Sequence, residues 1–545
     1  MNKVAHYLQE HLEGEVMTSP DARRYFATDG SILQVLPEVV VYPRSESDVR
    51  KAARFSWQLA ERGRVIPITA RGAGTDQSGA ALGSGIVLAF LAHMHRVLEY
   101  DGKNGVVVVE PGANYGKLQQ TLITHGRFLP SYPASLEYSS IGGAIANNAA
   151  GDKSVKYGST SEYVRSLRVV LANGEVIETG PLSKRELNKK LGLTTFEGEI
   201  YRAVDALLEE QKVPISKAVI NVTKNAAGYN IADVRQRDGT FDLTPLFVGA
   251  QGTLGIITEA VLDTELHNTA ATLFAARFDS IANMTQAIER LRKLPSLPSS
   301  IEMVDDNLLK LVDELNTNQL KGVVNKPFPR MILLVEFDDI NERTQKRLAK
   351  KAEKIFKDLA TDYKMELDKK RQDLMWRIRD TSAVVSSHVS DKARALPVIE
   401  DGIVPLDKFE EYLQGVYDLF ERSKMRPAVW GHAGDGNIHI QPFLDLAQVG
   451  DRQKLFRLMT EYYELVLRLG GSTSGQHNDG RLRAPFLKQL YGDEQYEVFR
   501  KIKKIFDPHG ILNPGVKVDV SLDDIKPLLR SEYSLHHLYD HMPRS

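Results

Sequence analysis

Four glycine-rich loops in the first half of the chain constrain its fold more than any other feature. They are RGAGTDQSG (71–79), SSIGGAIANNAAG (139–151), KYGST (156–160) and VGAQGTLGIIT (248–258). Glycine lets a backbone approach a phosphate closely and point several N–H groups toward it. One such loop is equally well explained as a structural turn. Four of them in one region predict a backbone that wraps an extended ligand with phosphates and a planar ring.

The loops do not match the standard nucleotide motifs. Residues 71–79 have neither the G-x-G-x-x-G spacing of dinucleotide-binding folds nor the Gly-Lys-Ser/Thr ending of a Walker loop. Around the loops, short apolar runs alternate with helical patterns, and residues 164–180 read as a hairpin with its turn at Ala172-Asn173-Gly174. The pattern predicts an α+β fold for roughly the first 265 residues.

Length and composition limit the classes of protein further. A chain of 545 residues is too long for one ordinary core. Its net charge of -1 gives no global field to hold nucleic acid. With no cysteine, the chain cannot form disulfides, thiolate zinc sites or iron–sulfur clusters. The start of the chain lacks an apolar signal region and no long apolar run follows, so we expect no membrane span and a cytoplasmic location, with peripheral membrane contact as an alternative.

Two histidine-containing stretches lie in the second half. GHAGDGNIH (431–439) places His432 and His439 around a turn, and SGQHNDGR (474–481) adds His477. Histidine is both a common metal ligand and a base that works near neutral pH. The residues alone leave open whether the three histidines form a metal site, a catalytic site or neither.

Taken together, these stretches resemble one flavoprotein family. PEVVVYPRSESDV, RGAGTDQSG, PSYPASLEYSSIGGAIANNAAG, GAQGTLGIIT, WRIRD, GHAGDGNIH and FDPHGILNPG match, in order, the FAD-linked oxidoreductases of the vanillyl-alcohol oxidase and p-cresol methylhydroxylase superfamily. Within it, the chain resembles the D-lactate dehydrogenase and glycolate oxidase flavoprotein subunit group. The resemblance implies an α+β fold with a two-subdomain FAD-binding domain of the p-cresol methylhydroxylase type and an α+β cap domain with an antiparallel sheet. The implied segments are 1–266 (N-terminal segment and FAD-binding domain), 267–475 (cap), 476–520 (return to the FAD domain) and 521–545 (tail).

The resemblance implies FAD as the cofactor, held by three of the loops. The first loop would face the pyrophosphate through Arg71, Gly72, Ala73, Gly74, Thr75, Gln77 and Ser78. The second would run along the pyrophosphate and ring at Gly142, Gly143, Asn147 and Gly151. The last would lie on the adenine and ribose side at Gly252, Thr253 and Ile257. This arrangement needs no net basic charge, because backbone amides can bind phosphate.

In the resembling enzymes, the two histidines of the H-x-G-D-G-N-x-H stretch bind a divalent metal together with the glutamate of a Gly-Glu-His-Gly stretch. The histidine after that glutamate is the catalytic base. The matching residues here are His432, His439, Gln476 and His477. Because Gln476 replaces the glutamate, the ligand set carries one negative charge less. Two interpretations stay open: a site for Zn, Mn or Fe, and a metal-free histidine pocket.

Two further positions bear on the substrate. Arg379 in WRIRD matches an arginine that contacts the substrate carboxylate in related enzymes, although an ordinary salt bridge would also explain it. Relatives acting on dicarboxylic hydroxy acids carry a lysine near PVIEDGIVP, where this chain has Ile399. We therefore expect a small monocarboxylate.

The function implied is FAD-dependent oxidation of a D-2-hydroxy acid, lactate- or glycolate-like, to the 2-oxo acid. Hydride would go to flavin N5, with His477 as base and Arg379 on the carboxylate. Electrons would pass to a separate acceptor, a protein or a quinone, since the chain has no cysteine-rich extension. The alternatives are a metal-free flavoenzyme like the alkyl-glycerone-phosphate synthases and an FAD-binding subunit without turnover. A homodimer is expected, and the tail would dock a partner or membrane surface or pack on its own domain.

Overall fold

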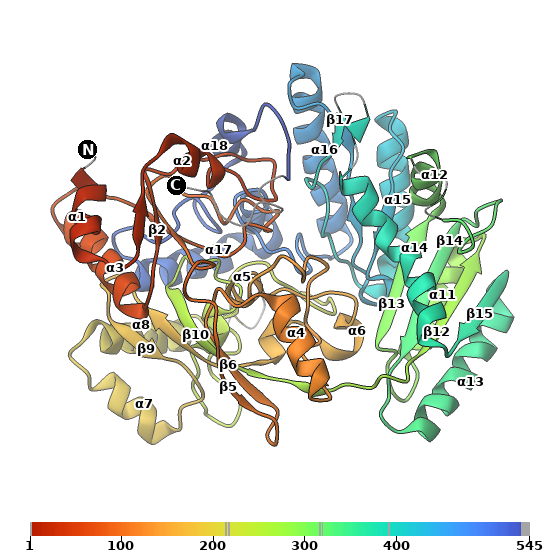
Figure 1. The fold of residues 1–545 in the computed structure, drawn as a ribbon, viewed down its shortest axis with the longest axis horizontal. Coiled ribbons are helices and arrows are strands. Elements are labelled where there is room, and N and C mark those ends of the chain that lie inside the picture. Colours follow the sequence, from red (N-terminus) through yellow and green to blue (C-terminus); the bar gives the residue numbers. More distant parts are fainter. Residues whose placement is uncertain are drawn as a thin grey trace.

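The fold is described from a computed structural model of the chain. It covers residues 3–535 apart from 213–214, 216–218, 316–317, 319, 388 and 391–392, with the backbone alone for 383–387 and 389–390. Figure 1 shows the N-terminal half, coloured red to yellow, beside the green and cyan cap, with the blue C-terminal segment reaching back between them. The α+β prediction is therefore confirmed.

The first sheet places the first glycine loop. Its strand order is β1-β2-β4-β3, with β2, β4 and β3 parallel and β1 antiparallel to β2. The parallel strands are short runs of buried apolar residues, as expected for a sheet covered on both faces. Because β3 ends at Arg71, the loop begins where that strand stops. The elements are α1 (Lys3–His11), β1 (Glu15–Met17), α2 (Pro20–Tyr25), β2 (Val39–Tyr42), α3 (Glu46–Glu61), β3 (Ile68–Arg71) and β4 (Ile86–Ala89).

The second sheet is antiparallel, with strand order β5-β6-β10-β8-β9. Its strand β10 alternates buried and half-buried residues, which directs one face to the core. The predicted hairpin at residues 164–180 is confirmed as the β8–β9 pair. The elements are β5 (Val97–Asp101), β6 (Val106–Val109), α4 (Tyr115–Thr124), β7 (Arg127–Phe128), α5 (Ile141–Asn147), α6 (Ser154–Tyr157), β8 (Val164–Val170), β9 (Val176–Glu178), α7 (Lys184–Leu191), α8 (Phe196–Glu210), α10 (Thr244–Phe247), β10 (Ile256–Asp263) and β11 (Glu265–Leu266).

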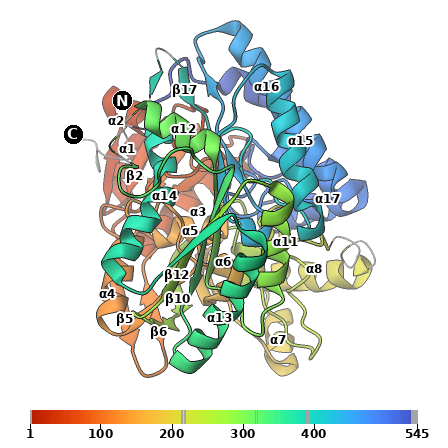
Figure 2. The ribbon, with the colours of Figure 1, turned by 90° about the vertical axis from the view of Figure 1, so that its right-hand side faces the viewer.

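The cap contains the predicted antiparallel sheet, with strand order β15-β12-β14-β13-β18-β19. Helices lie on both of its faces (Figure 2). Along β12, Phe274 packs in the same core as α11 and α13, while its neighbour Leu273 packs with α12 and α14, as strand alternation requires. The elements are β12 (Thr272–Phe278), α11 (Ile281–Arg292), β13 (Ser300–Asp305), α12 (Asp306–Leu315), β14 (Met331–Phe337), α13 (Glu342–Leu359), β15 (Asp362–Glu366) and α14 (Lys369–Ser387).

The cap ends in two packed helices and a short hairpin. The hairpin joins β18 to β19 through a 3-10 turn, η3 (Ala433–Asp435), and it carries the first two histidines. Helices α15 and α16 pack against each other, α15 also packs on α11, and α16 also packs on β20. The elements are β16 (Val389–Ser390), β17 (Ala393–Ala395), α15 (Phe409–Arg422), β18 (Val429–Gly431), β19 (His439–Ile440), β20 (Phe443–Leu444) and α16 (Val449–Arg468).

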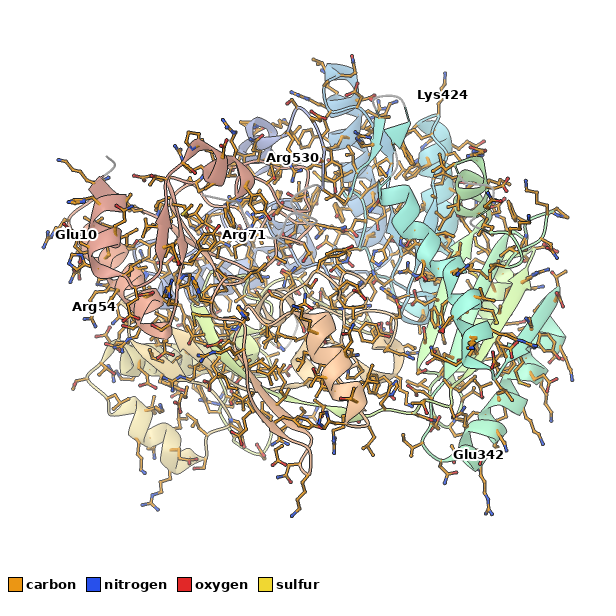
Figure 3. The ribbon with its side chains drawn as sticks, in the orientation of Figure 1. Glu10, Arg54, Arg71, Glu342, Lys424 and Arg530 are labelled. Carbon is orange, nitrogen blue, oxygen red and sulfur yellow. The ribbon has the colours of Figure 1, made fainter. Side chains whose placement is uncertain are left out.

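The C-terminal part returns to the N-terminal half. Helix α17 (Leu487–Phe506) packs Phe506 against Phe247, and Leu512 forms a bridge to Ile68. After α18 (Leu522–Ile525), Arg530 donates to carbonyl groups near residue 30, so the described part of the tail packs on its own chain. In Figure 3, Arg530 and Arg71 lie inside the outline of the molecule, whereas Glu342 and Lys424 project from the cap. Residues 536–545 of the predicted tail lie outside the described residues.

Among the helices in the described part of the chain, not one combines the length and apolar character needed to cross a bilayer.

Candidate active site

The glycine loops line a cavity of about 830 Å³ in the N-terminal half. It lies between the end of β3, the start of α5 and the start of β10. Most of the residues predicted to hold the cofactor are in its wall, namely Arg71, Gly72, Ala73, Gly74, Thr75, Gly142, Gly143, Asn147, Gly252 and Ile257.

The walls of this cavity suit a ligand with phosphates. The backbone N–H groups of Gly72, Ala73 and Thr75 have no hydrogen-bond partner among the described residues, so they are available to an anion. Gly252 has a φ of +71, and a Cβ there would meet only Ala70 at 3.8 Å. A side chain at that position would therefore take space from the ligand. These features fit the FAD pyrophosphate predicted for the loops.

The other predicted cofactor residues take supporting positions. Gln77 lines the adjoining cavity instead. The Ser78 hydroxyl donates to Asp76, and the Thr253 hydroxyl donates to the Ala250 carbonyl. Gly151 lies so close to the Tyr132 carbonyl that a Cβ would approach its oxygen to 2.1 Å. Their contact with FAD stays a prediction.

A second cavity, of about 1290 Å³, adjoins the first and shares Thr75, Asp76, Gly143 and Asn147 with it. It reaches from the flavin loops to the cap. Four residues with predicted catalytic, substrate or metal roles share its wall, namely Arg379, His439, Gln476 and His477. Trp430, Gln441 and Leu535 line the same wall. His432 lies behind this wall, 2% exposed.

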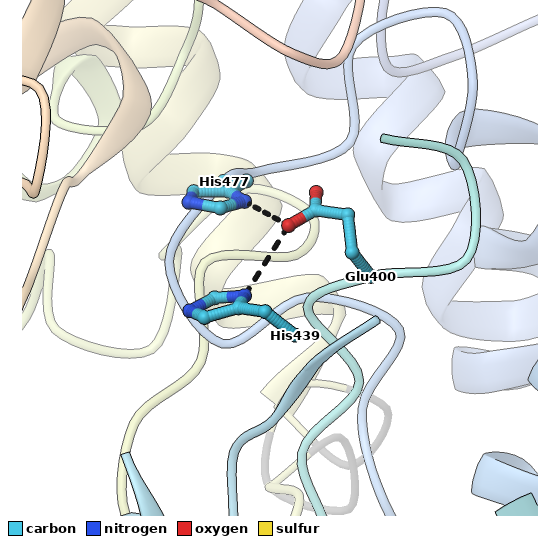
Figure 4. Close-up of side chains that lie close together, drawn as sticks. All are labelled: Glu400, His439 and His477. Atoms are coloured by element: carbon cyan, nitrogen blue, oxygen red, sulfur yellow. Dashed lines mark hydrogen bonds and ion pairs between the residues drawn. The ribbon is translucent and has the colours of Figure 1, made fainter. Parts of the chain in front are cut away.

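Two of the histidines share one carboxylate, that of Glu400 (Figure 4). Nδ1 of His477 lies 2.6 Å from Oε2 of Glu400, and Nδ1 of His439 lies 3.3 Å from the same oxygen. The two rings are stacked, with centroids 5.0 Å apart. The other oxygen of Glu400 accepts from Arg483 at 3.2 Å, and the carboxylate of Asp401 accepts the backbone N–H of His477 at 2.7 Å.

Burial and the neighbouring charges shift the pKa values of the three histidines in different directions. Burial lowers the pKa of His477, but the carboxylates of Glu400 and Asp401 outweigh it, so the pKa rises above its usual value. Burial holds the pKa of His439 below its usual value, and that of His432 well below it. Burial by itself would raise the pKa of Glu400, yet His477, His439 and Arg483 keep it well below the usual range. Of the three histidines, His477 is therefore the one whose pKa lies above the usual histidine value.

The three predicted metal ligands meet, but not with the atoms that a metal needs. Nε2 of Gln476, which is the amide nitrogen, lies 2.9 Å from Nε2 of His432 and 3.4 Å from Nε2 of His439. Its amide oxygen instead accepts from the Lys224 ammonium group at 2.7 Å. A divalent cation requires a lone pair from each ligand, and an amide NH₂ group offers none. In this arrangement the three residues do not fit a divalent metal.

Two other groups of ligand-type side chains lie close together in the described residues: Glu400 with His439 and His477, and Asp152 with Glu302 and His432. Both groups are already charge-paired. Glu400 pairs with Arg483, and Glu302 pairs with Arg379.

Arg379 of α14 forms a salt bridge and also lines the second cavity, so its contact with a substrate carboxylate stays a prediction. Its Nε donates to Oε2 of the fully buried Glu302 at 2.7 Å, which is an ion pair, and Nη1 donates to Oγ of Ser382 at 2.9 Å. The same guanidinium group lines the second cavity. Ile399, by contrast, is fully buried in the cap core and does not line it.

Sequence reasoning missed the residues that organise the histidines. Glu400 and Asp401 form an acidic pair inside the apolar stretch 397–405, a signal that could have marked them as buried and functional. Glu302 sits in the fully buried strand β13. Lys224 and Arg483 carry no such signal, since an isolated basic residue in a polar loop is usually on the surface.

One segment, residues 476–483, connects the two cavities. Asn478 donates to the Gly249 carbonyl at 2.9 Å, and the backbone N–H of Gly480 donates to the Gln251 side chain at 2.8 Å, so both hold the last flavin loop. Gln476 and His477 face the histidine site. Asp479 forms a fully buried ion pair with Lys517 at 2.8 Å.

Family models agree with this organisation. The model described as "FAD binding domain" matches residues 37–180, and "FAD linked oxidases, C-terminal domain" matches residues 267–516. The chain belongs to the FAD-linked oxidases with an FAD-binding domain of the p-cresol methylhydroxylase type. The predictions of the family and of FAD are confirmed.

Curated relatives extend the match over most of the chain. It is 30% identical over 522 residues to a D-2-hydroxyglutarate dehydrogenase of Escherichia coli, covering 93% of this chain and 50% of that protein. The chain thus spans about half the length of this dehydrogenase. It is 29% identical to a D-lactate dehydrogenase of Archaeoglobus fulgidus, covering 92% of this chain and 96% of that one. A glycolate oxidase subunit of Bacillus subtilis is 28% identical, with 88% and 89% covered.

Solved structures share the fold. A 4-ethylphenol oxidase from Gulosibacter chungangensis superposes with a TM-score of 0.66 at 17% identity, covering 95% of this chain and 97% of that one. An alkyldihydroxyacetonephosphate synthase superposes with a TM-score of 0.65 at 16% identity, covering 94% and 86%. At these identities the likeness concerns the fold alone.

Proposed function

We propose that this chain, with FAD bound, oxidises a D-2-hydroxy acid of lactate or glycolate size to the 2-oxo acid. One observation carries the proposal: His477 and Arg379 line a single cavity that adjoins the flavin loops. The relatives are named for D-2-hydroxyglutarate, D-lactate and glycolate, which are all 2-hydroxy acids.

His477 is the proposed base. Because its Nδ1 faces Glu400, the proton sits on Nδ1 and Nε2 keeps its lone pair, with no partner among the described residues. Nε2 can then accept the proton of the substrate hydroxyl. The carboxylate of Glu400 stabilises the imidazolium that forms. Bound FAD supplies the acceptor for the substrate's α-hydride.

Arg379 is the proposed anchor for the substrate carboxylate. The ion pair with Glu302 fixes the guanidinium plane at the cavity wall, while Nη2 has no hydrogen-bond partner in the described part of the chain. A fixed guanidinium group recognises a carboxylate with defined geometry, which orients the α-carbon. Arg379 is the only lysine or arginine among the described residues that line this cavity, which favours a monocarboxylate.

The electrons then leave to a separate acceptor, a protein or a quinone. The chain has no cysteine with which to ligate an iron–sulfur cluster of its own.

The test is anaerobic mixing of the FAD-loaded protein with D- and L-lactate, glycolate and D-2-hydroxyglutarate, following the visible flavin absorbance. We expect D-lactate or glycolate to bleach the flavin fastest. Bleaching by D-2-hydroxyglutarate alone would overturn the size assignment. A stable yellow protein that no 2-hydroxy acid bleaches would overturn the reaction and favour a synthase-like chemistry or a subunit without turnover.

A further inference from the structure

A buried ammonium group lies behind the histidine site. Lys224 is 8% exposed, and its Nζ donates to Oε1 of Gln476 at 2.7 Å and to Oγ of Ser154 at 3.0 Å. The carboxylate of Asp435 lies 3.6 Å from Nζ. A charged amine so far from solvent is retained only where such partners satisfy it.

The ammonium group decides which way the Gln476 amide faces. An ammonium group has three donors and no acceptor, so only the amide oxygen can face Lys224. The NH₂ group must then point the other way. That direction is occupied by Nε2 of His432 at 2.9 Å and Nε2 of His439 at 3.4 Å.

The two imidazoles are arranged to receive this amide. Nδ1 of His432 is hydrogen-bonded to Glu302 at 2.7 Å, which places the ring proton on Nδ1, and Nδ1 of His439 is the nitrogen of its ring that faces the carboxylate of Glu400, at 3.3 Å. Each Nε2 is left as an acceptor for the amide N–H groups. The Nε2 lone pairs of His432 and His439, which would bind a metal, therefore point at the NH₂ group of Gln476.

We propose that Lys224 and Gln476 together take the place of a divalent metal in this chain. The ammonium group supplies the fixed positive charge, and the carboxamide bridges the two imidazoles as the metal would. The difference between an amide nitrogen and a carboxylate oxygen at position 476 decides whether a metal can bind. A carboxylate at position 476 would give one oxygen to Lys224 and the other to the histidines, whereas the amide gives its only oxygen to Lys224.

The experiment measures metal and flavin per chain on protein produced in zinc- and manganese-supplemented medium, by elemental analysis and absorbance. The wild-type chain is expected to retain FAD and hold metal only in traces. Gln476→Glu is isosteric and is expected to gain about one ion per chain. In the matched control, His432→Ala added to Gln476→Glu, that ion should be lost, because it removes an imidazole ligand.

A second variant addresses Lys224 itself. Lys224→Met frees the amide to turn its oxygen toward the imidazoles, so zinc should bind at least about tenfold more tightly than to the wild type, yet more weakly than to Gln476→Glu. Titration with zinc against a fluorescent chelator measures this, and FAD content reports that the variant is folded.

Two results would overturn the inference. One is a wild-type chain that holds a stoichiometric ion and loses it on His432→Ala. The other is a folded, FAD-loaded Gln476→Glu chain that binds no ion. Neither readout involves a hydroxy acid, so the inference fails or stands separately from the proposed reaction.

Discussion

His477 and Glu400 are joined by a 2.6 Å contact between Nδ1 and Oε2, and this contact sets which ring nitrogen faces the cavity. A neutral imidazole has one donor and one acceptor nitrogen. Fixing the donor on the buried side makes Nε2 the acceptor, as proton removal from a bound hydroxyl requires. The carboxylate thereby selects the tautomer as well as the position of the base.

Replacing the base should abolish most flavin reduction while leaving the cofactor in place. His477→Asn retains a donor toward Glu400 but no proton acceptor of comparable basicity. General base catalysis is worth about 10²–10⁴-fold, so the anaerobic reduction rate should fall by that factor. The control is His125→Gln, at an exposed histidine that immediately follows α4. Equal rates in the two variants would remove His477 from the reaction.

The pH dependence should follow the carboxylates around His477. The base must be neutral, and its pKa lies above the usual value because of Glu400 and Asp401, so the rate should fall as pH drops through that raised pKa. Glu400→Gln removes one negative charge and lowers the pKa of His477. The acid limb of kcat/KM should then move to lower pH.

This variant leaves Arg483 without its carboxylate partner, so its folding needs checking by FAD content and thermal melting. An acid limb that stays in place in folded Glu400→Gln protein would show that another group controls the profile.

Arg379→Met should weaken substrate binding more than flavin binding. A charge-assisted hydrogen bond contributes about 1.5–3 kcal/mol, which corresponds to a rise in KM of roughly 10- to 100-fold. It also leaves the buried Glu302 without its cationic partner, at a cost of about 3–5 kcal/mol of stability. Adding Glu302→Gln should recover the melting temperature but not the KM. The exposed Arg377→Met on the same helix serves as the control, and a normal KM in Arg379→Met would exclude a role on the substrate carboxylate.

Gly142→Ala should loosen FAD. A Cβ there would lie 2.6 Å from Cβ of Pro111 and 2.8 Å from its carbonyl oxygen, so the start of α5 must shift away from the cavity that it lines. Overpacking of this kind costs about 1–3 kcal/mol, and FAD should dissociate roughly tenfold or more readily. Gly450→Ala, where a Cβ meets nothing within 4 Å, should retain FAD normally. Equilibrium dialysis against free FAD distinguishes the two.

The parts of the molecule that could be predicted are those encoded by a contiguous stretch of sequence. The glycine loops predicted the flavin cavity because each loop is a contiguous stretch whose backbone does the binding. The antiparallel cap sheet followed from family resemblance. The partner of Gln476 could not be predicted, since Lys224 lies 252 residues away and reaches it only through the fold. Likewise, the resemblance supplied three metal ligands, but only the packing around Gln476 shows which of its amide atoms faces the histidines.

The segment 476–483 contacts the last flavin loop and also contains the proposed base, His477. FAD binding and the position of the base are therefore expected to be thermodynamically coupled. If bound FAD orders this segment, then a change that orders the segment favours FAD binding in return, because linked equilibria are reciprocal. The buried pair of Asp479 and Lys517 lies at the centre of that coupling. Losing it would therefore cost the protein flavin as well as turnover, although neither side chain lines the flavin cavity.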